Sequence, residues 1–318
     1  MVHQLDAGEA SAALAIDLTA VIVAVTAEEP RVLALEGGRA LPSGPFQSRH
    51  RSLQQGVRAW VEEQTHHPLG YVEQLYTFAD RDRTRDGEGG RVVSISYLGL
   101  TRERAAAGAA TPAAGWYSWY GYFPWEDWRA GPPALVADVI VPRLETWADA
   151  APSDTRRERR QRISVAFAPA GRAWNEEFVL QRYELLWEAG LVPEAGAAVA
   201  AKTPSPPLGQ TMMHDHRRIL ATGIARLRAK IKYRPVVFEL MPASFTLLQL
   251  QRAVEALAGR RLHKQNFRRL IEGQGLVEDT GEVSTGTGGR PAKLFCFRGE
   301  VVVERTAAGS KLPLHHSG

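Results

Sequence analysis

The amino-acid sequence predicts an α+β protein with a strand-rich N-terminal part and a C-terminal winged helix-turn-helix. β-branched and other apolar residues dominate two runs between residues 14 and 36, as they do in strands. Two runs with helical spacing, joined by a short connector, lie between residues 246 and 272, and two strand-like runs follow them. A Pro-rich segment, AKTPSPPLG at 201–209, separates the two parts.

The length of the chain agrees with this division. A chain of 318 residues, 44% of them hydrophobic, can bury at least one sizeable core and is long enough for about two domains. We expect a flexible N-terminus at 1–13, an N-terminal domain at 14–200 with a long insertion from about 101 to 200, a linker at 201–211, a winged helix domain at 212–300 and a flexible tail at 301–318.

The N-terminal domain begins with a predicted β-hairpin. Its strands are IDLTAVIVAV at 16–25 and RVLALE at 31–36, and AEEP between them is turn-like. After LPSG at 41–44, a helix is predicted that holds RAWVEEQT at 58–65.

Residues 44–65 resemble a Nudix box, whose pattern is Gly, five residues, Glu, seven residues, Arg-Glu, an aliphatic residue, any residue, Glu-Glu, any residue and Gly. When Gly44 is placed on the first Gly, the residues Arg58, Glu62 and Glu63 match the pattern. Three other positions differ from it: His50, Ala59 and Thr65 stand where the pattern has Glu, Glu and Gly. The resemblance implies a Nudix-like α/β/α sandwich.

The substitutions imply that the box has lost its chemistry. In Nudix hydrolases the box carboxylates bind divalent cations, and Glu62 with Glu63 alone is a poor site for a hard cation. We therefore expect a degenerate Nudix-like domain with no catalytic residues and no metal, in which the Glu pair otherwise forms a solvated helix face. His66, His67, His214 and His216 have no Cys or acidic partner at zinc-ligand spacing, so capping or solvated roles are expected.

The insertion contains an aromatic segment and a basic segment. The aromatic segment, WYSWYGYFPWEDW at 116–128, is typical of a core or a dimer interface, and stacking on a nucleobase is the alternative. The basic segment, RRERRQR at 156–162, is expected to be a solvated helix face, with phosphate contact as the alternative.

The first helix of the C-terminal module has clear ends. Thr246 is a good N-cap, and Gly259 ends the run. Between them, the apolar residues Leu247, Leu250, Val254 and Leu257 recur at helical spacing.

The second helix, at 263–272, is the expected DNA-reading element. We expect Phe267, Leu270 and Ile271 to pack inward and the polar face to enter the major groove. Arg pairs with guanine, and Gln or Asn pairs with adenine, through two hydrogen bonds each. The candidate DNA-binding residues of this helix are Lys264, Gln265, Asn266, Arg268 and Arg269.

A two-stranded wing is predicted after this helix. Leu276 and Val277 begin it, the polar residues at 280–289 form its tip, and LFCF at 294–297 is the return strand. Arg290 and Lys293 border the tip, where contact with phosphate or the minor groove is expected.

Charge and cysteine content narrow the class of protein. Residues 215–298 hold 16 Lys or Arg and 7 Asp or Glu, a net charge of +9 against +4 for the whole chain, which is the footprint of a nucleic-acid-binding domain. A single cysteine, Cys296, excludes an internal disulfide framework. Since no apolar run approaches the roughly 18 residues that span a bilayer, we expect a cytoplasmic protein without membrane contact.

Several segments carry a second family resemblance: YVEQLYTFADRDR at 71–83, GRVVSISYLGL at 90–100, HDHRRIL at 214–220, and FTLLQLQ, HKQNFRR and GGRPAKLFCF within 245–297. Together these segments are similar to transcriptional regulators of the NrtR family. The long stretch between Leu100 and His214 departs from the usual short tail and is more similar to the NadQ regulators of NAD synthesis in alphaproteobacteria.

The resemblance implies a homodimeric repressor of NAD-metabolism genes that needs no cofactor and binds a double-stranded DNA operator. A nucleotide effector, ADP-ribose, NAD or ATP, would bind the Nudix-like domain and shift the winged helices between two arrangements. In Nudix folds the ligand lies over the sheet beside the box helix. The candidate effector contacts are Arg58, Phe78, Asp80 and Arg83.

Two other functions fit parts of the sequence. A Nudix-type nucleotide pyrophosphohydrolase with an accessory basic domain is the main alternative, and Ala59 in place of a carboxylate argues against it. An RNA-binding processing factor is the other, but the basic residues at 264–269 lie on a groove-sized helix without an aromatic platform for single strands.

Overall fold

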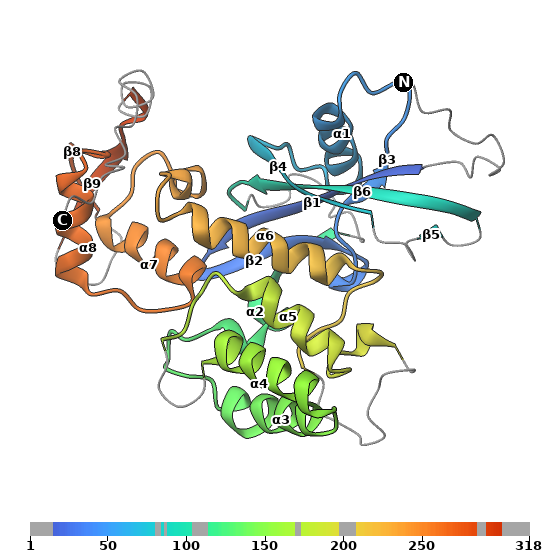
Figure 1. Ribbon diagram of the computed structural model, residues 1–318. Helices are drawn as coiled ribbons and strands as arrows, with labels where there is room; N and C mark the ends of the chain where they lie inside the picture. The colour runs from blue at the N-terminus through green and yellow to red at the C-terminus, as the bar shows by residue number, and fades with distance from the viewer. Residues whose placement is uncertain are drawn as a thin grey trace, which may run out of the picture.

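The computed structural model describes residues 15–79, 84–85, 88–103, 114–168, 173–196, 208–284 and 291–300 (Figure 1). Both expected flexible ends, most of the expected linker and half of the wing tip, 285–289, lie outside the described residues. The same holds for three of the predicted site residues, Asp80, Arg83 and Arg290.

A mixed sheet forms the centre of the N-terminal part. Its strands are β1 (Ala15–Thr26), β2 (Glu29–Leu35), β3 (Ser43–Pro45), β4 (Tyr71–Phe78), β5 (Thr84–Arg85), β6 (Glu88–Leu100) and β7 (Ala114–Ser118). The order is β4-β6-β1-β2-β7, with β3 added to β1 and β5 to β6. The predicted hairpin is confirmed, because β1 and β2 are antiparallel with Val25 opposite Pro30. β1 and β6 run parallel, with Asp17 beside Ser94.

Helices cover both faces of this sheet, which gives the expected α/β/α sandwich. On one face, Val57 and Val61 of the box helix α1 (Leu53–Thr65) pack against β1 residues such as Leu18 and Ile22. On the other face lies α6 (His216–Lys230), whose Leu220 contributes to the larger core. Figure 1 shows α1 above the sheet and α6 drawn across strands β1 and β2.

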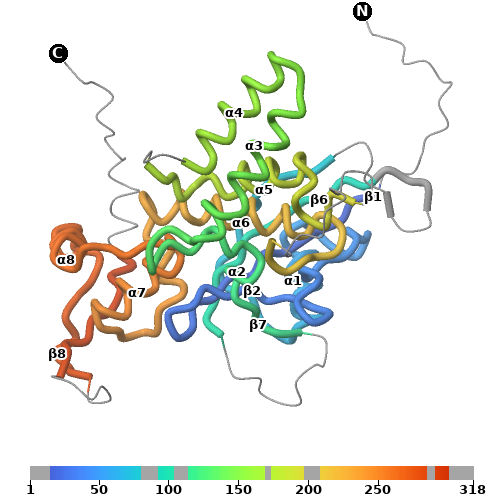
Figure 2. The backbone as a smooth tube through the Cα atoms, turned by 90° about the horizontal axis from the view of Figure 1, so that it is seen from below, coloured from blue at the N-terminus to red at the C-terminus, as the bar shows by residue number. Residues whose placement is uncertain are grey.

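The insertion contributes the edge strand β7 to the sheet, and its helices form a further layer beyond α6. Its helical elements are α2 (Trp119–Tyr122), a 3-10 turn at Pro124–Glu126, a π-helical turn at Val136–Ile140, α3 (Val141–Asp149), α4 (Ser153–Phe167), α5 (Val179–Glu188) and a 3-10 turn at Pro193–Ala195. Figure 2 shows α3 and α4 side by side and projecting away from the sheet.

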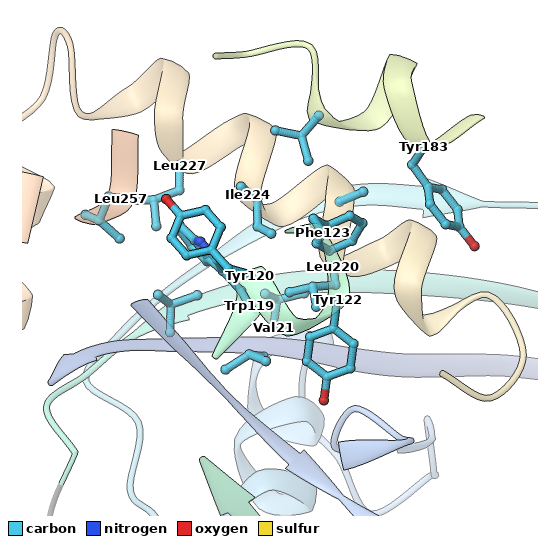
Figure 3. Packing of buried hydrophobic residues seen from close by; sticks show 14 of the residues in the cluster. Val21, Trp119, Tyr120, Tyr122, Phe123, Tyr183, Leu220, Ile224, Leu227 and Leu257 are labelled. Carbon is cyan, nitrogen blue, oxygen red and sulfur yellow. The ribbon is translucent and has the colours of Figure 1, made fainter. Parts of the chain in front are cut away.

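The aromatic segment at 116–128 lies largely in the core. The side chains of Trp119, Tyr122, Phe123 and Trp125 are fully buried, which supports the core interpretation and leaves these rings no open face for a nucleobase. Figure 3 shows Trp119 and Tyr120 packed near Leu227 of α6.

The basic segment at 156–162 is paired within the insertion. Arg159 stacks on Trp147 with its guanidinium 3.8 Å from the ring centre. Arg160 donates to Asp149 at 2.7 Å, and Arg162 donates to Glu188. These arginines fasten α4 to α3 and α5, so they are poorly placed for contact with phosphate.

The C-terminal module is a winged helix-turn-helix. It contains α7 (Leu247–Ala258), α8 (Lys264–Gly273) and the antiparallel strands β8 (Val277–Ser284) and β9 (Ala292–Phe297). Both predicted helix ends of α7 are confirmed: Thr246 and Gln249 form a capping box, and Gly259 closes the helix at φ +72°. None of the described helices is both long enough and apolar enough to span a membrane.

Candidate nucleic-acid interface and ligand cavity

The exposed face of α8 carries all five candidate DNA-reading residues. Lys264, Gln265, Asn266, Arg268 and Arg269 are exposed. The helix is held from behind by Phe267 and Ile271, which are 7% and 8% exposed. Because Gln265 and Arg269 are four residues apart, they lie one above the other on the outward face.

The prediction for Leu270 is wrong. Its side chain is 56% exposed, whereas Phe267 and Ile271 are buried as expected. Successive residues are about 100° apart around a helix, so a stripe centred between Phe267 and Ile271 turns Leu270 out of the core. Leu270 therefore belongs to the edge of the exposed surface.

A buried carboxylate holds the turn between α7 and α8. Glu255, 1% exposed, accepts hydrogen bonds from the Leu262 N–H at 3.0 Å and from Gln251 at 2.8 Å. It also accepts from Arg252 and Arg261, each at 2.8 Å. Burial by itself raises the pKa of Glu255, but these hydrogen bonds outweigh it and lower the pKa to about 2.

The turn between the two helices is thus held by the side chain of Glu255, which the sequence analysis did not predict to have this role. A carboxylate near a helix C-terminus interacts unfavourably with the helix dipole. In this chain two arginines follow the carboxylate in the turn. That combination, Glu255 before Arg260 and Arg261, was the available signal.

The wing residue Lys293 is already paired within the protein. Its ammonium donates to Asp279 at 2.7 Å across the two strands. This pairing raises the pKa of Lys293 and lowers the pKa of Asp279. A DNA phosphate must therefore compete with an exposed carboxylate for this side chain.

The last turn of α7 is fastened to the body, by which we mean the described residues from Ala15 to Lys230. Carbonyl groups at a helix C-terminus have no partner within the helix. Here the Ala256 carbonyl accepts from the Tyr120 hydroxyl at 2.6 Å, and the Gly259 carbonyl accepts from the Trp128 N–H at 2.7 Å. The Leu257 carbonyl accepts from the Arg228 guanidinium at 2.8 Å.

Glu126 anchors this joint from within the body. It is 1% exposed and lies between the fully buried Arg182 and Arg228, to which it bonds at 2.6 Å each. Gly259 lies so close that a Cβ there would be 2.4 Å from the Glu126 carbonyl oxygen. The insertion, α6 and α7 therefore meet at a buried, charged contact.

A cavity of about 330 Å³ opens at the other end of α6. It lies on the α6 face of the sheet, on the side away from α1. Its lining residues are Asp17, Thr19, Glu36, Ala40, Ser43, Gly44, Val92, Ser94, Met213, His214, Asp215, His216 and Ile219. The start of α6 is docked beside it, because His216 Nδ1 accepts from the Leu41 N–H at 3.0 Å and the Met213 N–H donates to the Arg39 carbonyl at 2.7 Å.

The two described effector candidates lie away from this cavity. Arg58 donates to the carbonyls of Leu69 and Gly70 and so holds the loop after α1. Phe78 is 3% exposed, and the guanidinium of Arg218 covers its ring at 5.3 Å. The prediction assumed a site on the box-helix side, whereas the cavity is on the opposite face.

His50, which stands where the Nudix pattern has a Glu, has a structural role. His50 is 7% exposed, and its Nδ1 accepts from the Gln47 N–H at 3.1 Å. Glu62 and Glu63 are exposed on α1. Within the described part of the chain, no group of three or more His, Cys, Asp or Glu is placed to hold a metal ion.

These features define a class: a winged helix DNA-binding module joined to a Nudix-like sandwich. The comparison with protein families is specific for the module. Residues 237–297 match the model described as the NrtR DNA-binding winged helix domain.

Relatives and solved structures agree with this fold. The chain is 41% identical over 83 residues to the "ADPR responsive transcriptional repressor NtrR" of Acinetobacter baylyi; the match covers 26% of this chain and only a third, 33%, of that repressor. The crystal structure of Shewanella oneidensis NrtR complexed with a 27mer DNA superposes with a TM-score of 0.53 at 20% identity, covering 91% of this chain and 95% of that one. A MutT/nudix family protein from Enterococcus faecalis gives 0.51 at 16% identity, covering 93% and 90%.

Proposed function

We propose that this protein is a transcriptional repressor that binds a double-stranded DNA operator and responds to a nucleotide effector. The observation that carries the proposal is the surface of α8, where Lys, Gln, Asn and Arg side chains stand exposed on a buried Phe267–Ile271 spine. The family match of the same segment supports it. The target genes, in this proposal, are those of NAD metabolism.

In the proposed complex α8 lies in the major groove. Gln265 and Asn266 suit adenine, and Arg268 and Arg269 suit guanine. Lys293, together with Arg290, contacts phosphate from the wing. The protein acts as a homodimer, because two copies of one reading helix match two half-sites about one helical turn apart.

ADP-ribose is the first candidate effector, because the Acinetobacter relative is described as responsive to it. NAD and ATP share its adenosine and phosphate groups and remain in the proposal. The protein binds this effector without hydrolysing it, since Ala59 and His50 replace two carboxylates of the Nudix pattern. Asp80 and Arg83 keep their proposed effector roles, while Arg58 and Phe78 are engaged in the packing described above.

Helix α6 offers the route from effector to DNA. Its first turn lines the cavity, and its last turn holds the Leu257 carbonyl of α7 through Arg228. Figure 1 shows α6 crossing strands β1 and β2 and ending beside α7. A ligand that prefers one position of α6 therefore biases the position of α8, and this differential binding is what regulation requires.

A mobility-shift experiment tests the proposal. The purified full chain is mixed with the DNA upstream of its own gene, and ADP-ribose, NAD and ATP are titrated in at fixed salt. We expect a specific complex whose amount changes with one of the three nucleotides. Binding no tighter than to an unrelated DNA of equal length would refute the repressor, and magnesium-dependent turnover of ADP-ribose would favour the hydrolase.

A further inference from the structure

We infer that Leu270 reads thymine in the operator, through contact between its side chain and the 5-methyl group that thymine presents in the major groove. Asn266, one helical turn earlier, acts with it, so this strip of α8 selects A·T base pairs. The inference rests on the proposed function, because it assumes that α8 enters the major groove. It goes further by naming a residue and the chemical group that this residue recognises.

Leu270 is an exposed apolar side chain on the reading surface. Its side chain is 56% exposed, and among the large aliphatic side chains that the structure describes none is more exposed. A single exposed leucine is ordinary on a protein surface and indicates nothing by itself. What distinguishes Leu270 is its position, because it lies on the same short helix as the five exposed polar residues that are proposed to contact DNA.

Helix geometry places Leu270 beside Asn266. Successive residues are about 100° apart around a helix, so residues four positions apart are only about 40° apart and about one turn along the axis. Side chains on a helix lean toward its N-terminus, so the side chain of Leu270 leans over the turn that holds Asn266. The two residues therefore form one strip, between the buried Phe267 on one side and the exposed Arg269 on the other.

The two side chains suit the two bases of an A·T pair. In the major groove adenine presents an acceptor at N7 and a donor at N6, which the amide of Asn266 matches with two hydrogen bonds. Thymine presents its 5-methyl group there, and an apolar side chain is the complement of that group. The Cβ atoms of residues four positions apart are about 5–6 Å from each other, so the two side chains reach the same base pair or adjacent pairs.

The charge around Leu270 favours DNA over a protein as its partner. Helix α8 carries three exposed basic residues, Lys264, Arg268 and Arg269, against one exposed acid, Glu272. The cores of protein–protein interfaces are depleted of charged residues, so a protein that covered Leu270 would have to bury unfavourable groups beside it. The phosphates that line the groove of DNA neutralise the same basic residues.

Removal of the methyl group from the DNA tests the inference. The full chain first selects its preferred site from random DNA duplexes, and each thymine of that site is then replaced, one at a time, by uracil, which lacks only the methyl group. Fluorescence anisotropy measures the affinity for each duplex. At one thymine position the wild type should bind the uracil duplex about 4-fold more weakly, since burial of one methyl group contributes about that factor.

Substitutions at Leu270 show whether this loss arises from its side chain. Leu270→Ala should bind the thymine duplex about 4-fold more weakly than the wild type does, and it should bind the thymine and uracil duplexes equally. Leu270→Met keeps an apolar side chain of similar volume and should retain most of the discrimination. Both variants should fold, because the position is exposed and alanine and methionine are good helix formers.

The matched control is Leu248→Ala. Leu248 is 46% exposed and lies in α7 of the same module, so this substitution removes exposed apolar surface outside the reading helix. The control should discriminate between thymine and uracil as strongly as the wild type does. If Leu270→Ala weakened binding to both duplexes alike and also changed the oligomeric state of the protein, Leu270 would be a subunit contact and the inference would be overturned.

The same measurements separate this inference from the proposed function. If the wild type selects no preferred sequence, the repressor is refuted, and the reading role of Leu270 is refuted with it. If a site is selected but none of its thymines responds to methyl removal, or the response persists in Leu270→Ala, the repressor stands and only the inference is refuted.

Discussion

The contact between Gly259 and the body gives a prediction whose magnitude follows from the geometry. Replacement of Gly259 by Ala puts an L residue at φ +72°, which costs about 1–2 kcal/mol. The new Cβ would also lie 2.4 Å from the Glu126 carbonyl oxygen and 2.7 Å from the Arg228 guanidinium. Overpacking of a dense site costs about 1–3 kcal/mol more, so the total loss is about 2–5 kcal/mol.

Gly275→Ala is the matched control for this change. Gly275 has φ +60°, and a Cβ there would meet nothing within 4 Å. It should therefore lose only the conformational part, about 1–2 kcal/mol. The difference between the two variants isolates the contact between the winged helix and the body.

Urea unfolding of the full chain, followed by tryptophan fluorescence, measures this difference, because Trp119 and Trp125 are buried beside the joint. Fluorescence anisotropy with operator DNA, with and without ADP-ribose, measures its consequence. Gly259→Ala should lose most of the response to ADP-ribose and keep DNA affinity, since α8 is untouched. Equal destabilisation by both substitutions, or an undiminished response in Gly259→Ala, would refute the reasoning.

Three further predictions concern the reading helix, the turn and the box. Arg268→Ala should lose about 1–3 kcal/mol of binding free energy at the operator and relax base preference. Lys293→Ala should weaken binding to all DNA alike and reduce the slope of log affinity against log salt concentration by about 0.9. Anisotropy titrations at several salt concentrations distinguish the two variants, and identical behaviour would contradict the division of roles. Because the pKa of Glu255 is about 2 in the folded protein and its ordinary value is 4.5, the ionised carboxylate stabilises the protein above pH 4.5, and that contribution is lost as the pH falls toward 2. In Glu255→Gln the midpoint of unfolding should therefore depend less on pH over this range. An unchanged pH profile would show that the carboxylate does not organise the turn. The rate of ADP-ribose hydrolysis with magnesium should stay far below about 1 per second. Hydrolysis at that rate, if it disappears in Glu62→Gln, would show that the protein is a hydrolase.

Local signals explain why much of the fold was predictable. The N-cap Thr246 and the terminating Gly259 act within one helix, so both ends of α7 follow from a short stretch of sequence. The first hairpin follows from alternation and a turn in the same way. Leu270 shows the limit, because apolar character does not decide whether a residue at the edge of a helical stripe is buried.

The joint and the cavity depend on residues far apart in the chain. Glu126 and Arg228 are 102 positions apart, and nothing near either residue indicates the other. Asp17 meets Ser94 only because β6 returns parallel to β1. The one available signal was that Asp17 and Thr19 interrupt an apolar strand, and a polar residue on the inner face of a strand needs a reason to be there.

The fastening of α7 has a consequence for the exchange of parts between proteins. Sequence comparison delimits the winged helix as a unit of its own, yet three carbonyls at the end of α7 take their donors from Tyr120, Trp128 and Arg228 outside that unit. A graft of the unit onto another sandwich would leave those carbonyls uncapped unless the recipient supplied donors at the same places. In a chimera, the contact around Gly259 therefore decides whether the winged helix and the recipient sandwich are compatible. The reading helix and the residues of this contact must be transplanted together.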